Sequence, residues 1–244
     1  MRHIPVTLVV IAGWPEPTEV AVRDTLAQFS FDAAITFGSH PIAGTRWIDT
    51  TITCALDAAV VRTFRVLPHV KTSHVLFIDW DGYPVRQDVW EDAFLEYDYI
   101  GAVWPWFTER SVGNSGFCLR SQNIMATLSH DRTIRLVEPE DISLCRDWRP
   151  YLEERHGIRF APEDVADRFS VEHGSAGHAS FGFHGIWNML YFMDDEAVKR
   201  RLMTLERNQW TKQQIDTLGY RAVTAGRREL YRWINAKRAE VLNG

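Results

Sequence analysis

Residues 74–82, HVLFIDWDG, decide the fold expected for this chain. An apolar run of strand type, from Val75 to Ile78, ends in two carboxylates at alternate positions, Asp79 and Asp81, and a glycine follows them. The strands of α/β proteins present functional groups at their carboxyl ends, where the sheet opens into a crevice. Carboxylates in that place are suited to hold a divalent cation over a phosphate group. The stretch therefore favours nucleotide-dependent chemistry over passive binding.

The segments on either side alternate between strand and helix patterns. Further strands are expected over residues 5–13, 33–37 and 99–103, and helices over residues 18–29, 49–67, 89–95 and 122–130. Alternation of this kind builds a mixed, mostly parallel sheet flanked by helices. Residues 112–121 read as a glycine-bearing loop that enters a strand. Beyond residue 130 the chain reads as mostly helical, apart from a tight loop at residues 181–185. We expect one α/β domain over residues 1–196 and a basic helical extension over residues 197–244, packed on or beside it.

The composition of the 244 residues is that of an ordinary globular protein, with 45% hydrophobic and 24% charged residues. Three cysteines, Cys54, Cys118 and Cys145, are scattered singly, which indicates neither a zinc site nor a disulfide framework and fits a reducing compartment. No apolar run approaches the ~20 residues of a bilayer span, and the amino terminus lacks a signal-peptide cleavage region. These features predict a cytoplasmic protein.

Charge is unevenly distributed along the chain. The net charge of −5 argues against nucleic acid as a partner, because phosphate backbones require a strongly cationic surface. Residues 197–244 carry 11 Lys and Arg against 4 Asp and Glu, a local +7, which leaves −12 for the rest. Peripheral membrane contact through this basic tail is one interpretation. A solvated helical surface is the simpler one, and we favour it.

Two carboxylates separated by one residue point to the same side of an extended strand, so Asp79 and Asp81 could converge on one cation. An Asp-Gly pair at a strand end is also ordinary turn chemistry. The position of the pair directly after a buried apolar run favours the metal-binding interpretation.

A second candidate segment is the loop formed by Gly113, Asn114, Ser115 and Gly116. Glycine permits close backbone approach to a ligand, and small polar residues leave hydrogen-bond donors available. A simple hairpin fits the same letters equally well.

Acidic residues also begin a predicted helix at Glu140 and Asp141, where the helix dipole stabilises carboxylates whether or not they act. The functional alternative is that one of the two accepts a proton from an attacking hydroxyl. Their spacing does not decide between these interpretations.

One histidine and one aromatic loop complete the candidates. His184 lies between two glycines and could complete a metal site begun by the aspartates; His173 and His178 compete with it. Trp104 and Trp106 share a proline-containing loop that could form a platform for a sugar acceptor, although most tryptophans pack in cores. We expect only one of this pair to contact substrate.

Taken in order, DWDG (79–82), GNSGF (113–117), EDI (140–142) and FGFHG (181–185) resemble the motifs of the GT-A glycosyltransferase superfold. The stretches EYDYIGAVWPW, VGNSGFCLRS, PEDISLCR and FGFHG look more closely like an uncharacterised bacterial domain family known only as glycosyltransferase-like. The resemblance covers roughly residues 8–188 by motif order.

The resemblance implies that Asp81, with Asp79, binds Mn²⁺ or Mg²⁺ and the phosphates of a nucleotide-sugar donor, and that His184 is the remaining protein ligand. It further implies that residues 113–116 line the cleft and that Asp141 is the base of an inverting transfer. A UDP-sugar is the favoured donor, and a glycan or lipid-linked glycan of polysaccharide biosynthesis is the expected acceptor. The family usually has glutamine at Asp79 and glycine at Ser115, so Asp81 is the safer ligand.

Two other functions fit parts of the sequence. A sugar-phosphate nucleotidyltransferase would carry a basic, glycine-rich loop after its first strand, but AGWPEP stands there and contains neither Lys nor Arg. A catalytically silent carbohydrate-binding or scaffold protein of the same fold would use the aromatic loops equally well. Metal-dependent donor binding separates that protein from an enzyme.

Overall fold

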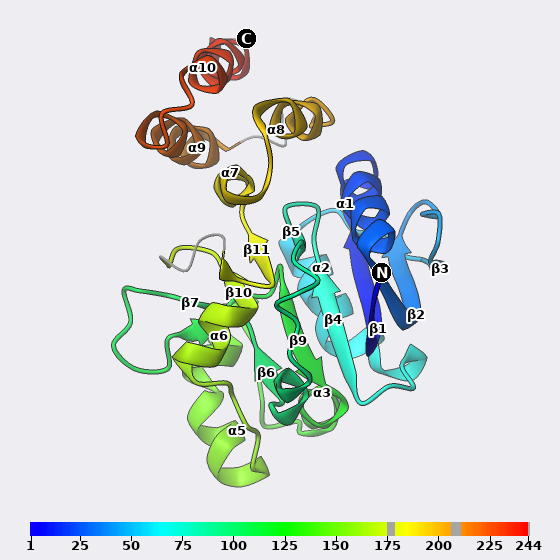
Figure 1. Cartoon of the computed structure of the whole chain (residues 1–244). Coiled ribbons are helices and arrows are strands. Elements are labelled where there is room, and N and C mark those ends of the chain that lie inside the picture. The colour runs from blue at the N-terminus through cyan, green and yellow to red at the C-terminus, as the bar shows by residue number, and fades with distance from the viewer. Residues whose placement is uncertain (175–178, 206–210, 244) are drawn as a thin grey trace. The chain divides into compact units, whose positions relative to one another are not determined.

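The computed structural model describes residues 1–174, 179–205 and 211–243. The chain divides into two compact units, Met1–His184 and Gly185–Gly244 (Figure 1). The first unit is α/β, and the second is helical in its described residues. The expected division into residues 1–196 and 197–244 stays a prediction, because compactness does not test which residues act together.

The main sheet of the first unit has the strand order β3-β2-β1-β4-β9-β6. Its strands are β1 (Arg2–Ala12), β2 (Phe29–Gly38), β3 (Arg46–Asp49), β4 (His74–Ile78), β6 (Tyr99–Ile100) and β9 (Cys118–Ser121). The first four run parallel, while β9 is antiparallel to both β4 and β6. The mixed, mostly parallel sheet expected from the alternating pattern is therefore confirmed.

Helices pack on this sheet because its central strands are apolar on both sides. All five residues of β4 are buried, as continuous apolar runs in parallel sheets predict. One face packs against residues of α2 (Ala55–Val60), the π-helix η1 (Val61–Arg65) and α3 (Gln122–His130). Helix α1 (Pro15–Gln28) follows β1, and α3 lies where the sequence placed it.

Three predicted elements differ from the structure. The helix expected over residues 49–67 begins only at Ala55, because Asp49 ends β3 and the Asp57 carboxylate holds the preceding turn by accepting from the Thr53 amide and hydroxyl. Its last turn is a 3₁₀ helix, η2 (Leu67–His69), and the helix expected over residues 89–95 is the 3₁₀ helix η3 (Asp92–Glu96). The strand expected over residues 99–103 is divided between β6 and β7 (Ala102–Val103), which pairs with β8 (Val112–Gly113).

A second, three-stranded sheet corrects the expectation at residues 181–185. These residues are not a tight loop: β11 (Gly182–His184) pairs in parallel with β10 (Ser170–Val171) and antiparallel with β5 (Gly82–Pro84). Three residues are too few to show strand periodicity, and the flanking glycines suggested a turn instead. The remaining helices of this unit are α4 (Glu140–Ile142), the π-helix η4 (Ser143–Asp147), α5 (Arg149–His156) and α6 (Glu163–Phe169).

The second unit contains η6 (Ile186–Asn188), α7 (Met189–Phe192), α8 (Asp195–Leu202), α9 (Lys212–Thr224) and α10 (Arg228–Asn243). Helices α9 and α10 pack together and bury Ile215, Leu218, Leu230 and Ile234.

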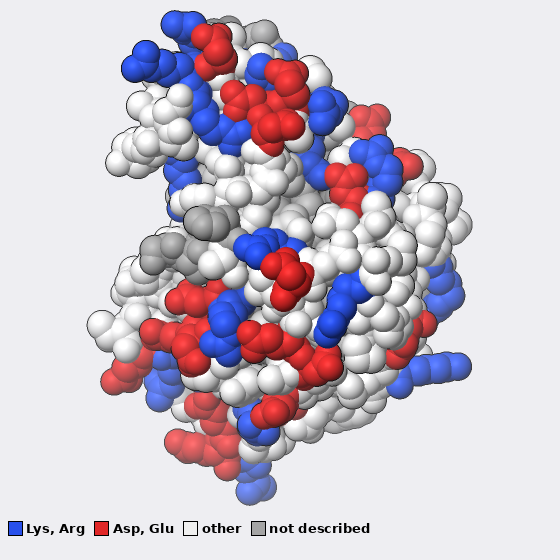
Figure 2. Space-filling model, viewed as in Figure 1, with Lys and Arg blue, Asp and Glu red and all other residues white. Residues whose placement is uncertain are grey.

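Several cations of the second unit form ion pairs within it, including Arg227 with Asp195 and Arg238 with Asp216. Figure 2 shows acidic and basic side chains intermixed on the viewed face. Membrane contact through the basic tail stays a prediction. None of the helices in the described part of the chain has the length and apolar character needed to cross a bilayer.

Candidate active site

The two aspartates that follow β4 lie in a tight turn. The Asp79 amide donates to the Gly82 carbonyl at 2.9 Å and the Gly82 amide donates back at 3.2 Å, so the chain reverses at Trp80 and Asp81 and continues into β5. The chain is thus not extended through both carboxylates, and the turn geometry that Asp-Gly also predicted is the one present. Asp81 is buried, whereas the side chain of Asp79 is 25% exposed.

The register of the small sheet brings distant residues to this turn. His184 pairs with Gly82 across β11 and β5, which places its Nε2 atom 3.6 Å from Oδ1 of Asp81. On the other side of β11, Val171 pairs with Phe183, so the next residue, Glu172, reaches the His184 ring. Strand pairing therefore unites side chains from three separate segments.

Glu172 orients the His184 imidazole. Its Oε1 atom lies 2.8 Å from Nδ1 of His184, and its Oε2 atom accepts a 2.9 Å hydrogen bond from Nε1 of Trp104. Burial raises the pKa of Glu172, but the hydrogen bond and charge of His184 outweigh it and hold the pKa at about 2. An ionised carboxylate only accepts hydrogen bonds, so Nδ1 carries a proton and Nε2 is the atom that faces Asp81. Asn114 Nδ2 lies 2.7 Å from the same Nδ1.

Asp81 is buried and His184 is partly buried, and the pKa values of both are shifted by desolvation and by the charges around them. Burial raises the pKa of Asp81 to about 6, although the charge of His184 opposes this. Burial lowers the pKa of His184, but Asp81, Glu172 and Asp79 overcome it and raise the pKa to about 10. At neutral pH the two groups carry opposite charges. Their 3.6 Å separation is nevertheless too long for a good hydrogen bond.

The glycine-bearing loop makes room for protein side chains. A Cβ atom on Gly116 would collide with the His184 imidazole, and one on Gly113 would collide with the Trp104 indole. Asn114, at φ +88°, is held in this unusual conformation by its own Oδ1 atom, which accepts from the amides of Gly116 and Phe117 at 2.7 and 3.0 Å. The glycines therefore allow the His184 imidazole and the Trp104 indole to pack directly against the loop backbone, where the sequence led us to expect a ligand.

The acidic pair at the start of α4 separates into two environments. Glu140 is buried, and its carboxylate accepts from Arg120 Nη1 at 2.9 Å and from the hydroxyl of Ser115. Burial raises the pKa of Glu140, but the Arg120 guanidinium more than offsets this, so the net pKa is lowered. Asp141 is half-buried, and its pKa is raised by burial first and by Glu140 second; Glu172 and His184 also act on it. Asp141 is therefore the carboxylate of this pair that shares the electrostatic field of the imidazole.

The two tryptophans of the aromatic loop have different surroundings. Trp104 is buried, with its N–H bonded to Glu172, while Trp106 is 54% exposed. Their rings stack with centroids 6.5 Å apart and an angle of 16°, and Trp106 also meets His173 edge-on at 4.8 Å. Only Trp106 presents a ring face to solvent. His178 lies outside the described residues.

A pocket of about 260 Å³ lies next to the turn at the carboxyl end of the main sheet, and we call it the carboxyl-end pocket. It is lined by Ile11, Gly13, Trp14, Ile52, Thr53, Cys54, Ala55, Ala58, Asp79 and Trp80. The rings of Trp14 and Trp80 lie 5.3 Å apart at its side. Beside it, Arg62 Nη2 donates to Asp79 Oδ2 at 3.2 Å, and its buried Nε has no partner within the described part of the chain.

Two residues of this site were not predicted from the sequence. Glu172 follows β10 as Asp79 follows β4, so the rule of carboxylates at strand ends applies to FSVEHG as well, but the strand before it is only two residues long. Arg62 lies among apolar residues of a predicted helix, on the side that the structure buries. Arginine is seldom buried without a charged partner, so its position in this apolar pattern was the available signal.

The described residues contain no ready-made cluster of three or more His, Cys, Asp and Glu side chains around a cation position. Two groups do converge. Ligands that share one Mn²⁺ or Mg²⁺ ion at about 2.1 Å lie at most about 4.2 Å apart, and Asp81 Oδ1 and His184 Nε2 meet this limit. Carboxylate and neutral imidazole are suitable donors, so the pair would fit a cation that displaces the proton from Nε2 and takes its other ligands from a bound phosphate and water.

Comparisons with known proteins leave the activity open. Residues 67–184 match the model of a family described as a protein of unknown function, DUF5672. No curated protein matches the chain. One similar solved structure is the crystal structure of a glycosyltransferase involved in the glycosylation of the major capsid of PBCV-1. It shares 13% identity and a TM-score of 0.46, over 82% of this chain and 100% of that one.

Proposed function

We propose that this protein is a glycosyltransferase that moves a sugar from a nucleotide-sugar to a hydroxyl acceptor with the help of a divalent cation. The observation that carries the proposal is the approach of Asp81 to His184, whose Nδ1 is bonded to Glu172, at the carboxyl end of the central strand. Nε2 of His184 and Oδ1 of Asp81 lie 3.6 Å apart, which is close enough for both atoms to reach one bound cation.

Asp81 and His184 would hold Mn²⁺ or Mg²⁺. The bound cation would neutralise the charge that develops on the departing diphosphate. Arg62, with its unpartnered Nε beside Asp79, would add positive charge at the same phosphates. The carboxyl-end pocket, with Trp14 and Trp80, would take the planar base of the nucleotide, because aromatic rings offer flat apolar surface to it. A uridine base is the first choice.

Asp141 would accept the proton of the acceptor hydroxyl. Its raised pKa makes it a better base than an exposed aspartate, and its neighbour Glu140 is engaged by Arg120 and Ser115. The exposed ring of Trp106 would contact the acceptor, a glycan or lipid-linked glycan. Direct attack by this hydroxyl inverts the anomeric configuration.

The proposal is tested by thermal shift of the full chain with a panel of nucleotide-sugars, each with and without Mn²⁺. A true donor raises the midpoint temperature by mass action, and only when Mn²⁺ is present. Asp81→Asn should abolish the metal-dependent part of the shift, while Asp49→Asn, at the sheet edge, should keep it. A protein that shows no metal-dependent shift with any donor is the silent carbohydrate-binding protein instead.

Turnover and product stereochemistry test the role of Asp141. Asp141→Asn should reduce turnover by about 10²–10⁴-fold, the usual contribution of a general base, while donor affinity stays nearly the same. Wild-type turnover in this variant, or a retained anomeric configuration, would exclude Asp141 as the base.

A further inference from the structure

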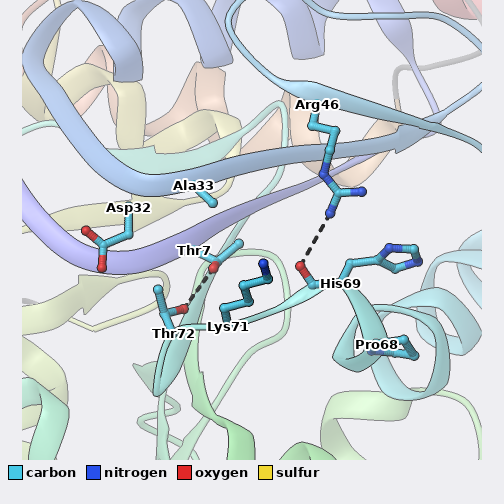
Figure 3. A pocket seen from close by; sticks show the side chains of 8 residues that line it. All are labelled: Thr7, Asp32, Ala33, Arg46, Pro68, His69, Lys71 and Thr72. Carbon is cyan, nitrogen blue, oxygen red and sulfur yellow. Dashed lines mark hydrogen bonds between the residues drawn. The ribbon is translucent and has the colours of Figure 1, made fainter.

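A second cavity lies at the opposite end of the main sheet. It has a volume of about 700 Å³ and is lined by Thr7, Asp32, Ala33, Arg46, Pro68, His69, Lys71 and Thr72, and we call it the amino-end cavity (Figure 3). Thr7 of β1 lines this cavity, and Ile11 of the same strand lines the carboxyl-end pocket. They are four residues apart along the strand, or about 13 Å. The amino-end cavity is thus distinct from the candidate active site.

Local backbone geometry opens this cavity. The pairing of β1 with β2 shifts register between Ile4 and Thr7, and the chain from η2 to β4 crosses the same end of the sheet. At this position the inner face of β1 carries Thr7 instead of the apolar residues found at Val9 and Ile11. The hydrophobic core therefore ends here, and polar side chains replace it.

Two cationic side chains, Lys71 and Arg46, line the cavity and have N–H groups available to donate to a ligand. Lys71 makes no hydrogen bond or ion pair with any residue that the structure describes, and in Figure 3 its side chain lies between the Thr7–Thr72 pair and Arg46. Arg46 donates one hydrogen bond, from Nη2 to the His69 carbonyl at 3.3 Å. Its remaining N–H groups form a planar fork suited to oxyanions.

The other polar groups of the cavity suit hydroxyl groups. Thr72 donates its single hydroxyl proton to the His74 carbonyl at 2.7 Å, so in the 2.8 Å contact between the two threonines Thr7 is the donor. Asp32, at the rim, has a half-exposed carboxylate that pairs with His3 at 3.2 Å and retains acceptor capacity. A ligand hydroxyl would find an acceptor there.

We propose that the amino-end cavity binds a small polyhydroxylated anion, with its phosphate or carboxylate group held by Arg46 and Lys71 and its hydroxyl groups facing Asp32. The charges that line the cavity support this: Arg46 and Lys71 are cationic, whereas the one carboxylate, that of Asp32, already pairs with His3. The volume exceeds what inorganic phosphate needs and suits a sugar phosphate or sugar acid. The inference does not depend on the proposed transferase activity.

The test is isothermal titration of the full chain with three probes: inorganic phosphate, glucose 6-phosphate and glucuronate. We expect glucose 6-phosphate or glucuronate to bind at least about tenfold more tightly than inorganic phosphate. Lys71→Gln and Arg46→Gln should each weaken that binding by about tenfold or more, since hydrogen bonds to charged groups carry the contact. Both residues are exposed, so the variants should fold normally. The preference between the two sugars identifies the anionic group.

Two controls keep the result unambiguous. Arg65→Gln removes an exposed cation from outside the cavity and should leave affinity unchanged, which excludes a general charge effect. Asp81→Asn should also leave it unchanged. Binding that is unaffected by both cavity variants, or that is lost in Asp81→Asn, overturns the proposal, as does the absence of binding by all three probes.

Discussion

Charged side chains have different surroundings at the two ends of the main sheet. At the carboxyl end, Glu140, Glu172 and His184 each form a charge-assisted hydrogen bond with a partner at least 12 residues away in the sequence. At the amino end, Lys71 and Arg46 are exposed and mostly unengaged. Buried charges persist only when they are paired, so the carboxyl end is organised before any ligand arrives. At the amino end few interactions hold the charged side chains, so substitutions there should be tolerated.

The largest expected difference between the two ends is in stability. Glu140→Gln leaves the Arg120 guanidinium fully buried without its carboxylate, and we expect it to lower the free energy of unfolding by about 3–5 kcal/mol. Arg46→Gln at the amino end should change it by no more than about 0.5 kcal/mol. Urea denaturation of both variants measures the contrast.

The double variant Arg120→Met/Glu140→Gln serves as the control for that contrast. Removing both charges should cost less than the sum of the two single variants, because neither ion is then left unpaired. Equal stability of Glu140→Gln and Arg46→Gln would show that the carboxyl end is no more organised than the amino end.

A smaller effect, on metal affinity, is expected from substitution of Glu172, which accepts hydrogen bonds from both His184 and Trp104. Glutamine has one acceptor oxygen, so in Glu172→Gln its amide group must face one of the two N–H donors. We expect Mn²⁺ affinity, measured by electron paramagnetic resonance, to fall by about 10–100-fold, as for other partners of ligating histidines.

Trp104→Phe provides the matched control for Glu172→Gln. The phenyl ring has no N–H, so in Trp104→Phe/Glu172→Gln the amide can turn away from His184 and part of the Mn²⁺ affinity should return. The ¹⁵N shifts of the His184 ring report the same change without metal. Unaltered shifts and affinity in Glu172→Gln would contradict the orienting role.

The smallest effect is a pH dependence at the amino end of β4. His74 is buried, which lowers its pKa although its bond to the Tyr97 carbonyl opposes this. The unfolded chain therefore takes up a proton first, and stability is lost as the pH falls from about 6.5 through the lower pKa of the folded state. The slope is at most about 1.4 kcal/mol per pH unit for one group.

His74→Gln removes this titration. Urea unfolding between pH 5 and 8 should show that the wild-type protein loses more stability than the variant on acidification. Parallel pH profiles for the two proteins would show that His74 does not contribute.

Much of the main sheet follows from local sequence. The apolar run before Asp79 and the helix pattern at residues 122–130 correspond to β4 and α3, because long or strongly apolar segments carry their own periodicity. Short elements do not: β3, β10 and β11 have two to four residues each and were not predicted as strands. Their stability comes from pairing with neighbours, which no local pattern records.

The sequence by itself determined the α/β class, the carboxylates at the end of β4 and the imidazole at residue 184. The tertiary structure decided their arrangement. It turned the chain at Trp80 and Asp81, set His184 opposite Gly82, and brought in Glu172 and Arg62. The physical reason is that residue type fixes which chemistry a side chain can perform, whereas the distance between two side chains depends on strand register and burial of the whole sheet.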